Sequence, residues 1–480
     1  MHTLRVPTPR RESPRPEGRS VSPLKNKPWR SSTALHFVQI IFWLLLTITA
    51  AHFAPFIFES FRHGADGELM AAFFDIAILC FLSFLTFYLS VSTPFPPFVI
   101  AIVFGMAAKP FFEPIVSNHI ILPLLVSLGA TLILFQGGLE TPFKNFRRLF
   151  WKIFMLAFPG VLVTGLLLSG TVSVVGSAFG LAIPALVAVL LGVVLASTDP
   201  AAVIPLLRGL EFKKRDIKDI IVSESAVNDV VGALLSLVLI SLAATGQPFE
   251  TIIGSYEHLF GYDAAIVLLK QIIFGLVFGV LGYVLLTFFV RHKNGHDKEH
   301  GADAAFFIFV PIITFAGALA LGGSGYLAAF VAGLVFYMVE HLKSTERFFN
   351  DVIDGFAKPI IFLLLGALVD VQQLINFAGI GLAVAFLFMF IVRPLMVFLT
   401  IGPFALFGKD RFTLSELLFI SWVRETGAIP AVLLITIVSL GLPGTEAIVP
   451  IGMWVILATL VVQPPVTPWL AHKLNLSQPE

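Results

Sequence analysis

Glu224, Ser225, Asn228 and Asp229 lie close together in the sequence SESAVNDVVG (223–232), within a longer apolar segment. Ser225 and Asp229 are four residues apart, and so are Glu224 and Asn228, so a helix would place each pair on one stripe of its surface. An ionised acid at the centre of a bilayer costs several kcal/mol. If this segment crosses a membrane, its two acids therefore need partner charges or a bound ion.

Two further apolar segments each carry polar residues beside a proline. In LAIPALVAVLLGVVLASTDPAAVIPLL, Thr198 and Asp199 directly precede Pro200; in ELLFISWVRETGAIPAVLLITIV, Arg424 and Glu425 precede a Gly-Ala-Ile-Pro sequence. A proline removes a helical hydrogen bond and clashes with the preceding turn, so both helices are predicted to be interrupted. Interrupted helices in corresponding places of two inverted halves indicate the substrate site of a transporter.

The charges expected inside the apolar segments sum to a negative value. They are the acids Asp199, Glu224, Asp229 and Glu425 and the bases Arg424 and Arg393, the last in the sequence IVRPLMV. Two bases minus four acids leave −2, which favours a cation or a proton over an anion. Oxygen donors without thiols or imidazoles suit Na⁺, K⁺ or Li⁺, because a divalent ion would normally recruit more carboxylates.

The composition indicates that a membrane surrounds these residues. Of 480 residues, 57% are hydrophobic and 13% are charged, against about 25% charged in a typical soluble domain. The mean hydropathy is +0.93. A soluble enzyme is therefore excluded, and 31 basic against 30 acidic residues give no support for nucleic-acid binding. The single cysteine, Cys80, cannot form an intrachain disulfide.

Fourteen segments approach the roughly 20 apolar residues that a membrane helix needs. They begin near residues 35, 70, 95, 119, 152, 181, 217, 263, 303, 323, 353, 375, 413 and 445. We therefore predict an all-α polytopic membrane protein with about 13–14 transmembrane helices. The two proline-interrupted segments are the sixth and the thirteenth, so they cross in opposite directions. Lys358-Pro359 begins the eleventh and is interpreted as its cytoplasmic entry into the membrane.

Lys and Arg are concentrated in alternate loops, which predicts that both termini face the cytoplasm of a cell-membrane protein. The loop 245–262 contains almost none and is predicted to lie outside. We expect residues 1–33 to form a disordered basic cytoplasmic tail, 34–470 the transmembrane domain and 471–480 a short cytoplasmic tail. An alternative for the first segment is a cleaved signal ending near Ala50-Ala51.

The motifs STDPAAV (197–203) and SESAVNDVVG (223–232) together resemble the electroneutral branch of the monovalent cation/proton antiporters. That branch includes bacterial sodium/proton antiporters and animal sodium/hydrogen exchangers. LILFQGGLE (132–140), IVRPLMV and SWVRETGAIP (421–430) occur in the expected order, and the resemblance covers about 70–470. It implies inverted repeats with two broken crossing helices, and a homodimer with a dimerisation half and a six-helix core that moves like an elevator.

The resemblance also implies roles for individual residues. Asp229 matches the aspartate that binds both proton and cation, and Ser225 matches a hydroxyl ligand one turn earlier. Thr198 and Asp199 match ligands at the broken helix, with Asp199 acting through water. Asn228 matches the asparagine that electrogenic relatives replace with a second aspartate.

Three further matches concern the surroundings of this site. Glu224 and Arg393 match a buried ion pair that holds the core together. Gln136 stands where many relatives have an acid, and Arg424-Glu425-Thr426-Gly427-Ala428 stands where many read Gly-Leu-Arg-Gly-Ala. Gln136, Arg424 and Glu425 are therefore candidate modulators, although Arg424 and Glu425 could also simply neutralise each other.

The expected function is not enzymatic. It is electroneutral one-for-one antiport of a monovalent cation for H⁺ by alternating access, with Na⁺ as the first choice and K⁺ or Li⁺ as alternatives. The expected partners are these ions, the lipid bilayer and a second copy of the chain, with no nucleic acid, no cofactor and no metal beyond the transported cation. A cation channel is the alternative, although no filter of repeated carbonyl or carboxylate rings is present. An intramembrane protease could pair Asp199 with Asp229, but no glycine-flanked aspartate motif supports it.

Overall fold

The computed structural model describes residues 29–61, 67–90, 93, 95–199, 207, 209–245, 249–293, 301–336, 343–403, 412–442 and 444–477. Within these residues every regular element is a helix and there is no strand. One isolated β-bridge pairs Phe212 with Ser477. Most of the predicted tail, residues 1–28, lies outside the described residues, and so does Pro200.

The first helices cover the chain up to the first predicted interruption. They are α1 (Trp29–Phe61), α2 (Gly67–Ser90), α3 (Pro97–Ala107), α4 (Lys109–Val116), α5 (Ile121–Glu140), α6 (Phe143–Ala157), α7 (Pro159–Ala178) and α8 (Ala185–Val194). Helices α3 and α7 begin with a proline, and α4 has one at its second residue. The N–H that proline lacks would have no partner inside the helix at these positions.

The remaining helices include two π-helical turns, η2 and η3. They are α10 (Arg215–Ala244), α11 (Ile252–Leu259), α12 (Tyr262–Lys293), α13 (Gly301–Ala320), α14 (Gly325–Val335), α15 (Lys343–Val352), η2 (Ile353–Ala357), α16 (Lys358–Leu368), α17 (Val371–Asn376), α18 (Ala378–Leu387), η3 (Phe388–Val392), α19 (Arg393–Thr400), α21 (Leu414–Trp422), α22 (Ala428–Ser439) and α23 (Ile448–Lys473). Because α1 begins at Trp29 and α23 continues to Lys473, the boundaries expected after 33 and 470 fall inside helices.

The helical membrane fold predicted from hydropathy is confirmed. Eight of the described helical segments are long and apolar enough to cross a membrane, or nine if the pair α3 and α4, bent by 88°, counts as one span. The other expected segments correspond to short or interrupted helices: α8, α13, α14, the run α15–η2–α16, and the pair α21 and α22. Interrupted backbone at membrane depth must be enclosed by protein, so these are the segments expected to surround a site.

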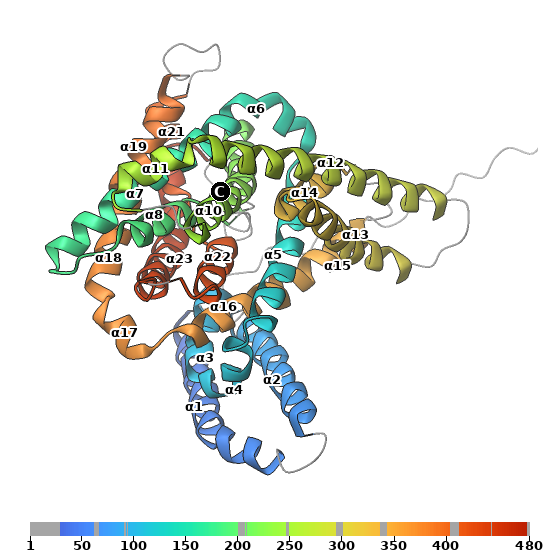
Figure 1. Cartoon of the computed structure of the whole chain (residues 1–480), viewed down its shortest axis with the longest axis vertical. Helices are drawn as coiled ribbons and strands as arrows, with labels where there is room; N and C mark the ends of the chain where they lie inside the picture. The colour runs from blue at the N-terminus through green and yellow to red at the C-terminus, as the bar shows by residue number, and fades with distance from the viewer. Residues whose placement is uncertain are drawn as a thin grey trace, which may run out of the picture.

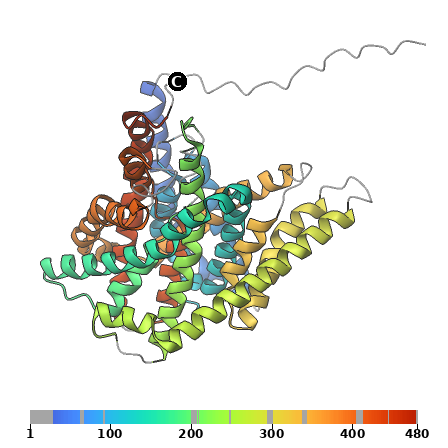
Figure 2. The same cartoon turned by 90° about the horizontal axis from the view of Figure 1, so that it is seen from above.

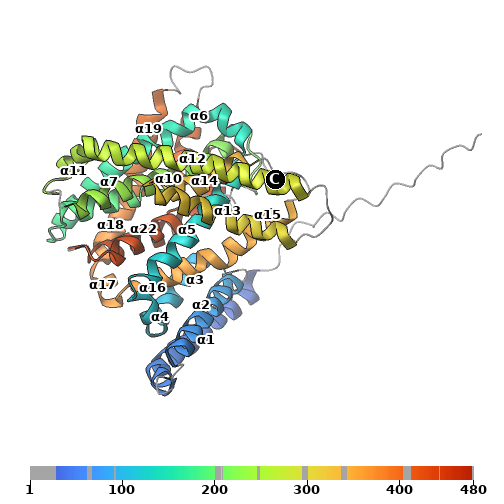
Figure 3. The same cartoon turned by 45° about the vertical axis from the view of Figure 1, so that its right-hand side comes forward.

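Among the short and interrupted helices, α16 and α22 lie toward the middle of the molecule (Figure 1). Helix α22 contacts α5, α8, α10 and α16, while α1 and α2 form a pair at one edge and α12 and α13 project at another. Figure 2 shows the bundle from above, and Figure 3 shows α5, α16 and α22 close together from a further direction.

Helices α5 and α14 approach each other through a reciprocal pair of glycines. A Cβ atom at Gly138 would overlap with the carbonyl oxygen of Phe330, and a Cβ atom at Gly333 would overlap with the carbonyl oxygen of Phe135. Both collisions involve backbone, which cannot turn aside as a flexible side chain can. Small residues allow membrane helices to pack this closely, so α5 and the Gln136 that it carries are held firmly against α14.

We predict that Gly333→Leu destabilises the protein by about 1–3 kcal/mol or more, because the added side chain must separate two packed backbones. The matched control is Gly170→Leu in α7, where no atom of the described residues outside the local helix lies within 4 Å of the new Cβ. Thermal unfolding in detergent should show a lower melting temperature for Gly333→Leu only. Equal melting of both variants would contradict the close α5–α14 contact.

Candidate functional site

The two interrupted segments meet at Asp199. Helix α8 ends at Val194, and the chain then continues without regular structure to Asp199. The Asp199 N–H donates to the carbonyl oxygen of Glu425 at 2.9 Å, and the Ala428 N–H, at the start of α22, donates to Asp199 Oδ2 at 3.1 Å. A carboxylate is stabilised at a helix N-terminus by the unpaired N–H groups and the helix dipole. Asp199 therefore ties the first interruption to the second.

Gly427 is required by this contact. Its position directly precedes α22, and a Cβ atom there would overlap with the Cβ and carboxylate atoms of Asp199. The glycine in the motif SWVRETGAIP thus allows the two interrupted backbones to touch, and Pro430 lies in the first turn of α22, which begins at Ala428.

Asn228 ties α10 to the first interruption. Its Oδ1 accepts hydrogen bonds from the backbone N–H of Thr198 at 2.9 Å and from the Thr198 hydroxyl at 3.0 Å. Its Nδ2 lies 2.7 Å from Thr198 Oγ1 and donates to Glu224 Oε1 at 2.8 Å. A carbonyl oxygen has two lone pairs, and both are engaged here. This arrangement favours a positioning role for Asn228 over direct contact with a bound cation.

Glu224 continues the same network to α19. Arg393 Nη2 lies 3.1 Å from Glu224 Oε2, and both residues are 1% exposed. A continuous network of buried polar contacts therefore links the interruption to α10 and α19, through Thr198, Asn228, Glu224 and Arg393 in that order. A buried charge stripped of its partner is strongly unfavourable, so each member depends on the others.

Two buried cations, Lys358 and Arg393, share an unusual local backbone. Each directly follows a π-helical turn, η2 or η3, and each directly precedes a proline, Pro359 or Pro394. In a regular helix the proline ring would clash with the carbonyl group four residues earlier, at 355 or 390, and both positions lie inside the π-helical turns. The wider turn relieves this clash, and such turns are frequent at functional sites.

Lys358 lies inside the site, and not at the membrane surface as its place in the sequence suggested. It is 1% exposed; its Nζ lies 2.8 Å from Asp354 Oδ1 and 3.9 Å from Asp199 Oδ1. The sequence did contain a signal for this buried position: Lys358-Pro359 repeats the pattern of Arg393-Pro394, in which a base directly precedes a proline. With Lys358 included, three buried bases against four buried acids leave −1, so the site is less negative than the −2 expected from the sequence.

Asp229 and Ser225 lie on α10, one turn apart, and each is 1% exposed. The Asp229 carboxyl interacts with the hydroxyl of Ser197. Within the described part of the chain, Asp229 Oδ1 and Ser225 Oγ have no hydrogen-bond partner. Buried polar groups are nearly always paired, so two unpaired oxygens on one helix stripe fit the donor set of a hard monovalent cation or a proton.

Arg424 and Glu425 do not pair with each other in the described residues. The Arg424 guanidinium lies over the ring of Phe388, 5.3 Å from its centroid, and the Glu425 carboxyl lies near enough to Asp199 for the two charges to interact. Both side chains are buried. Successive residues of an extended chain point in opposite directions, which separates this pair.

Gln136 does not contact Asp229 directly in the described residues. Its Nε2 donates to Asp354 Oδ1 at 3.0 Å, the same oxygen that Lys358 contacts. The polar residue at 136 therefore reaches the site indirectly, through Asp354 and Lys358. Asp354 was not singled out in the sequence, because it lies in a polar stretch that resembles a surface loop.

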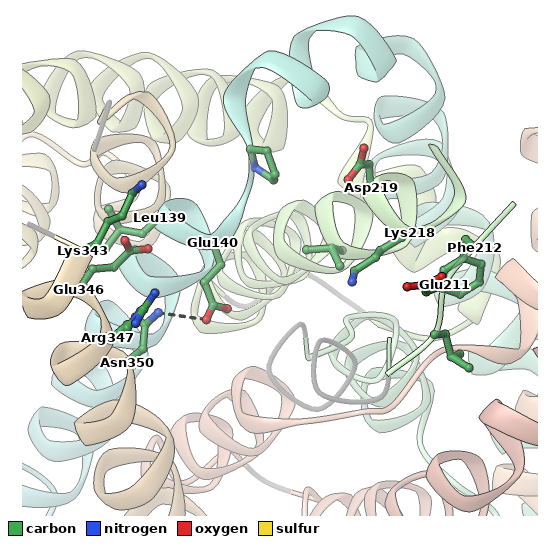
Figure 4. A pocket seen from close by; sticks show the side chains of 13 residues that line it. Leu139, Glu140, Glu211, Phe212, Lys218, Asp219, Lys343, Glu346, Arg347 and Asn350 are labelled. Atoms are coloured by element: carbon green, nitrogen blue, oxygen red, sulfur yellow. Dashed lines mark hydrogen bonds between the residues drawn. The ribbon is translucent and has the colours of Figure 1, made fainter. Parts of the chain in front are cut away.

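A pocket of about 760 Å³ opens beside the site, between the end of α5, the start of α10 and α15 (Figure 4). It is lined by Leu139, Glu140, Pro142, Leu210, Glu211, Phe212, Lys218, Asp219, Val222, Lys343, Glu346, Arg347 and Asn350. Val222 lies seven residues before Asp229 on α10, about 10 Å along the helix. The lining carries charges of both signs, and Asn350 bonds Glu140 across it at 3.2 Å.

Contacting, interrupted helices with buried carboxylates are the arrangement found in secondary transporters. The family model described as "Sodium/hydrogen exchanger, transmembrane" matches residues 76–473, so the chain belongs to this family of multi-pass membrane proteins. The sodium proton antiporter MjNhaP1 from Methanocaldococcus jannaschii has a similar fold: its TM-score is 0.60 at 20% identity, over 92% of this chain and 99% of that one. The predicted family and the predicted all-α polytopic membrane fold are thereby confirmed.

Curated relatives are also antiporters by name. The K(+)/H(+) antiporter NhaP of Alkalimonas amylolytica is 29% identical over 82% of this chain, and the K(+)/H(+) antiporter NhaP2 of Shewanella oneidensis is 30% identical over 71%. The "Probable Na(+)/H(+) antiporter 2" of Methanocaldococcus jannaschii is 24% identical over 64%. The match spans 66% of the Alkalimonas protein's length and 55% of the Shewanella protein's length.

We predict that Glu224→Gln and Arg393→Ala each lower stability by about 3–5 kcal/mol, because each leaves one buried charge without its partner. The matched control is Arg148→Ala, which removes an ion pair with Asp216 whose side chains are 57% and 36% exposed. Surface pairs contribute at most about 1 kcal/mol. The variants are compared by thermal unfolding in detergent. If all three melt at the wild-type temperature, the buried pair does not stabilise the protein.

Proposed function

We propose that the protein exchanges a monovalent alkali cation for H⁺ across the membrane by alternating access. The observation that supports this most directly is the buried stripe of α10, where Asp229 Oδ1 and Ser225 Oγ face no hydrogen-bond partner among the described residues. The names of the relatives, which are antiporters and not channels, support the same reaction class.

The proposed chemistry follows from one carboxylate with two mutually exclusive ligands. Asp229 binds either a proton or a cation, because a proton removes the negative charge that attracts the cation. Ser225 supplies a further oxygen to the cation, and Asp199 adds negative charge from the interruption. Thr198 and Asn228 hold that interruption in place through the bonds described above.

Alternating access then couples the two fluxes. A bare carboxylate in the membrane interior is costly, whereas a carboxylate carrying a proton or a cation is compensated. The site therefore changes sides only when it is occupied, and each ion that leaves is replaced by the other. The consequence for pH is that protons compete with the cation, so the apparent cation affinity weakens as the pH falls.

Na⁺ and K⁺ are the candidate cations. Oxygen ligands alone suit both, and the relatives' names include both K⁺/H⁺ and Na⁺/H⁺ antiporters. We keep Na⁺ as the first cation to test and place K⁺ beside it because of the curated K⁺/H⁺ relatives; Li⁺ is a third. The cytoplasmic position of both termini and the homodimer implied by the family resemblance stay predictions.

We predict that Asp229→Asn folds but loses coupled exchange in proteoliposomes, because an amide of the same shape cannot take up and release the proton. The matched control is Asp75→Asn, which changes another buried carboxyl, on α2. Ser83, on the same helix, marks the level of the site, because its hydroxyl donates to the carbonyl oxygen of Phe356 in η2. Asp75 lies eight residues before Ser83, which places it about 12 Å away along the helix. Substantial exchange by folded Asp229→Asn would refute the proposed carrier.

We also predict that exchange is electroneutral. One carboxylate swaps one proton for one cation of the same charge, and the Asn228 amide cannot carry a second proton. Na⁺-driven proton flux is measured in proteoliposomes with equal K⁺ on both sides, and valinomycin is then added to dissipate any membrane potential. The initial rate should not change; a clear acceleration would mean that net charge crosses in each cycle.

A further inference from the structure

Lys358 carries a buried positive charge directly beside the proposed cation site, and the mechanism above does not use it. It is 1% exposed and begins α16, immediately after the π-helical turn η2. A buried ammonium group needs compensation by nearby acids. Asp354 at 2.8 Å and Asp199 at 3.9 Å are within ion-pair distance, and Glu140 also interacts with the ammonium.

The two partners of Lys358 differ in their surroundings. The Asp354 side chain is 42% exposed and its Oδ1 accepts from both Lys358 and Gln136, whereas the Asp199 side chain is 1% exposed and faces the start of α22. The ammonium therefore has a hydrogen-bonding distance to Asp354 and only an electrostatic contact with Asp199. Gln136 fixes the position of Asp354, and so it indirectly fixes the ammonium.

We propose that Lys358 is a resident cation that competes with the transported cation for Asp199, and that Asp354 sets the apparent cation affinity by holding the Lys358 ammonium away from Asp199. This inference rests on the proposed exchange at Asp229. Lys358 stays charged throughout; what changes is how closely its ammonium approaches Asp199.

The argument is electrostatic. A cation bound near Asp199 and Asp229 is repelled by a fixed positive charge a few ångströms away, and this repulsion is strong where water is excluded. When the site is empty, the same charge reduces the repulsion between the two carboxylates. Lysine has a flexible four-carbon stem, so its ammonium can move between two acids that both lie within 4 Å of it.

Lys358→Met should therefore lower the apparent KM for Na⁺ and K⁺, by about fivefold or more, a common size for coupling between two sites. Asp354→Asn should raise KM, because the released ammonium moves toward Asp199. In the double variant, Asp354→Asn should have no further effect, since no ammonium remains to be released. Vmax and KM are measured separately at one fixed pH in proteoliposomes.

The double variant separates this inference from simpler explanations. If Asp354 acted only as a distant negative charge, Asp354→Asn would raise KM equally with Met at 358, and the inference would be wrong. If Lys358 were only structural, Lys358→Met would reduce Vmax or yield without lowering KM, which would equally overturn it. Lys270→Met, on the exposed face of α12, is the matched control and should leave KM unchanged.

Three further outcomes are informative. If Lys358→Met does not fold, Asp354→Asn still tests the inference, because an unchanged or lowered KM overturns it. Absence of exchange by wild type refutes the proposed function, and exchange by folded Asp229→Asn refutes Asp229 as the carrier on which this inference rests. Normal exchange that depends on Asp229, together with a KM that is insensitive to Lys358 and Asp354, refutes only the competition.

Discussion

The contact between the two interrupted helices at Asp199 is the point around which the buried charges of the site are arranged. The backbone N–H of Asp199 donates to the carbonyl oxygen of Glu425, and the Asp199 carboxylate accepts from the Ala428 N–H at the start of α22. Because a charge in an apolar membrane must be compensated, the acids and bases around this crossing form linked sets. One set runs from Thr198 through Asn228 and Glu224 to Arg393, and the other from Asp199 through Lys358 and Asp354 to Gln136. Between them, Asp229 keeps one oxygen without a hydrogen-bond partner in the described residues.

The two linked sets suggest a division of labour. The first is closed: its members are deeply buried and hydrogen-bonded to one another, so it can hold α10 against the interruption. The second reaches the half-exposed Asp354 beside α15, whose residues line the pocket in Figure 4. We propose that the closed set provides rigidity and that the second adjusts affinity. Each set contains one cation that directly follows a π-helical turn: Arg393 follows η3 and Lys358 follows η2.

Local sequence features predicted the parts of the site that depend on local geometry. Four-residue spacing placed Ser225 on the stripe of Asp229, and the Gly-Ala-Ile-Pro sequence predicted the interruption between α21 and α22. Hydropathy alone predicted the membrane segments, although it could not predict the 88° bend between α3 and α4. The position of Lys358 depends on tertiary packing, because a lysine before a proline also fits a membrane boundary. The place of the Arg424 guanidinium likewise depends on Phe388, which is distant in sequence.

The central claim is that one carboxylate, Asp229, binds proton and cation in turn. Proton release on cation binding tests it without any need for transport. Purified protein is placed in weakly buffered detergent solution at a pH where the site is protonated, and Na⁺ or K⁺ is added while the pH is recorded. Because a carboxyl ligand must lose its proton to bind a metal ion, wild type should release about one proton per bound cation and Asp229→Asn should release none. Cation binding by wild type without proton release, or equal release from Asp229→Asn, would contradict the account.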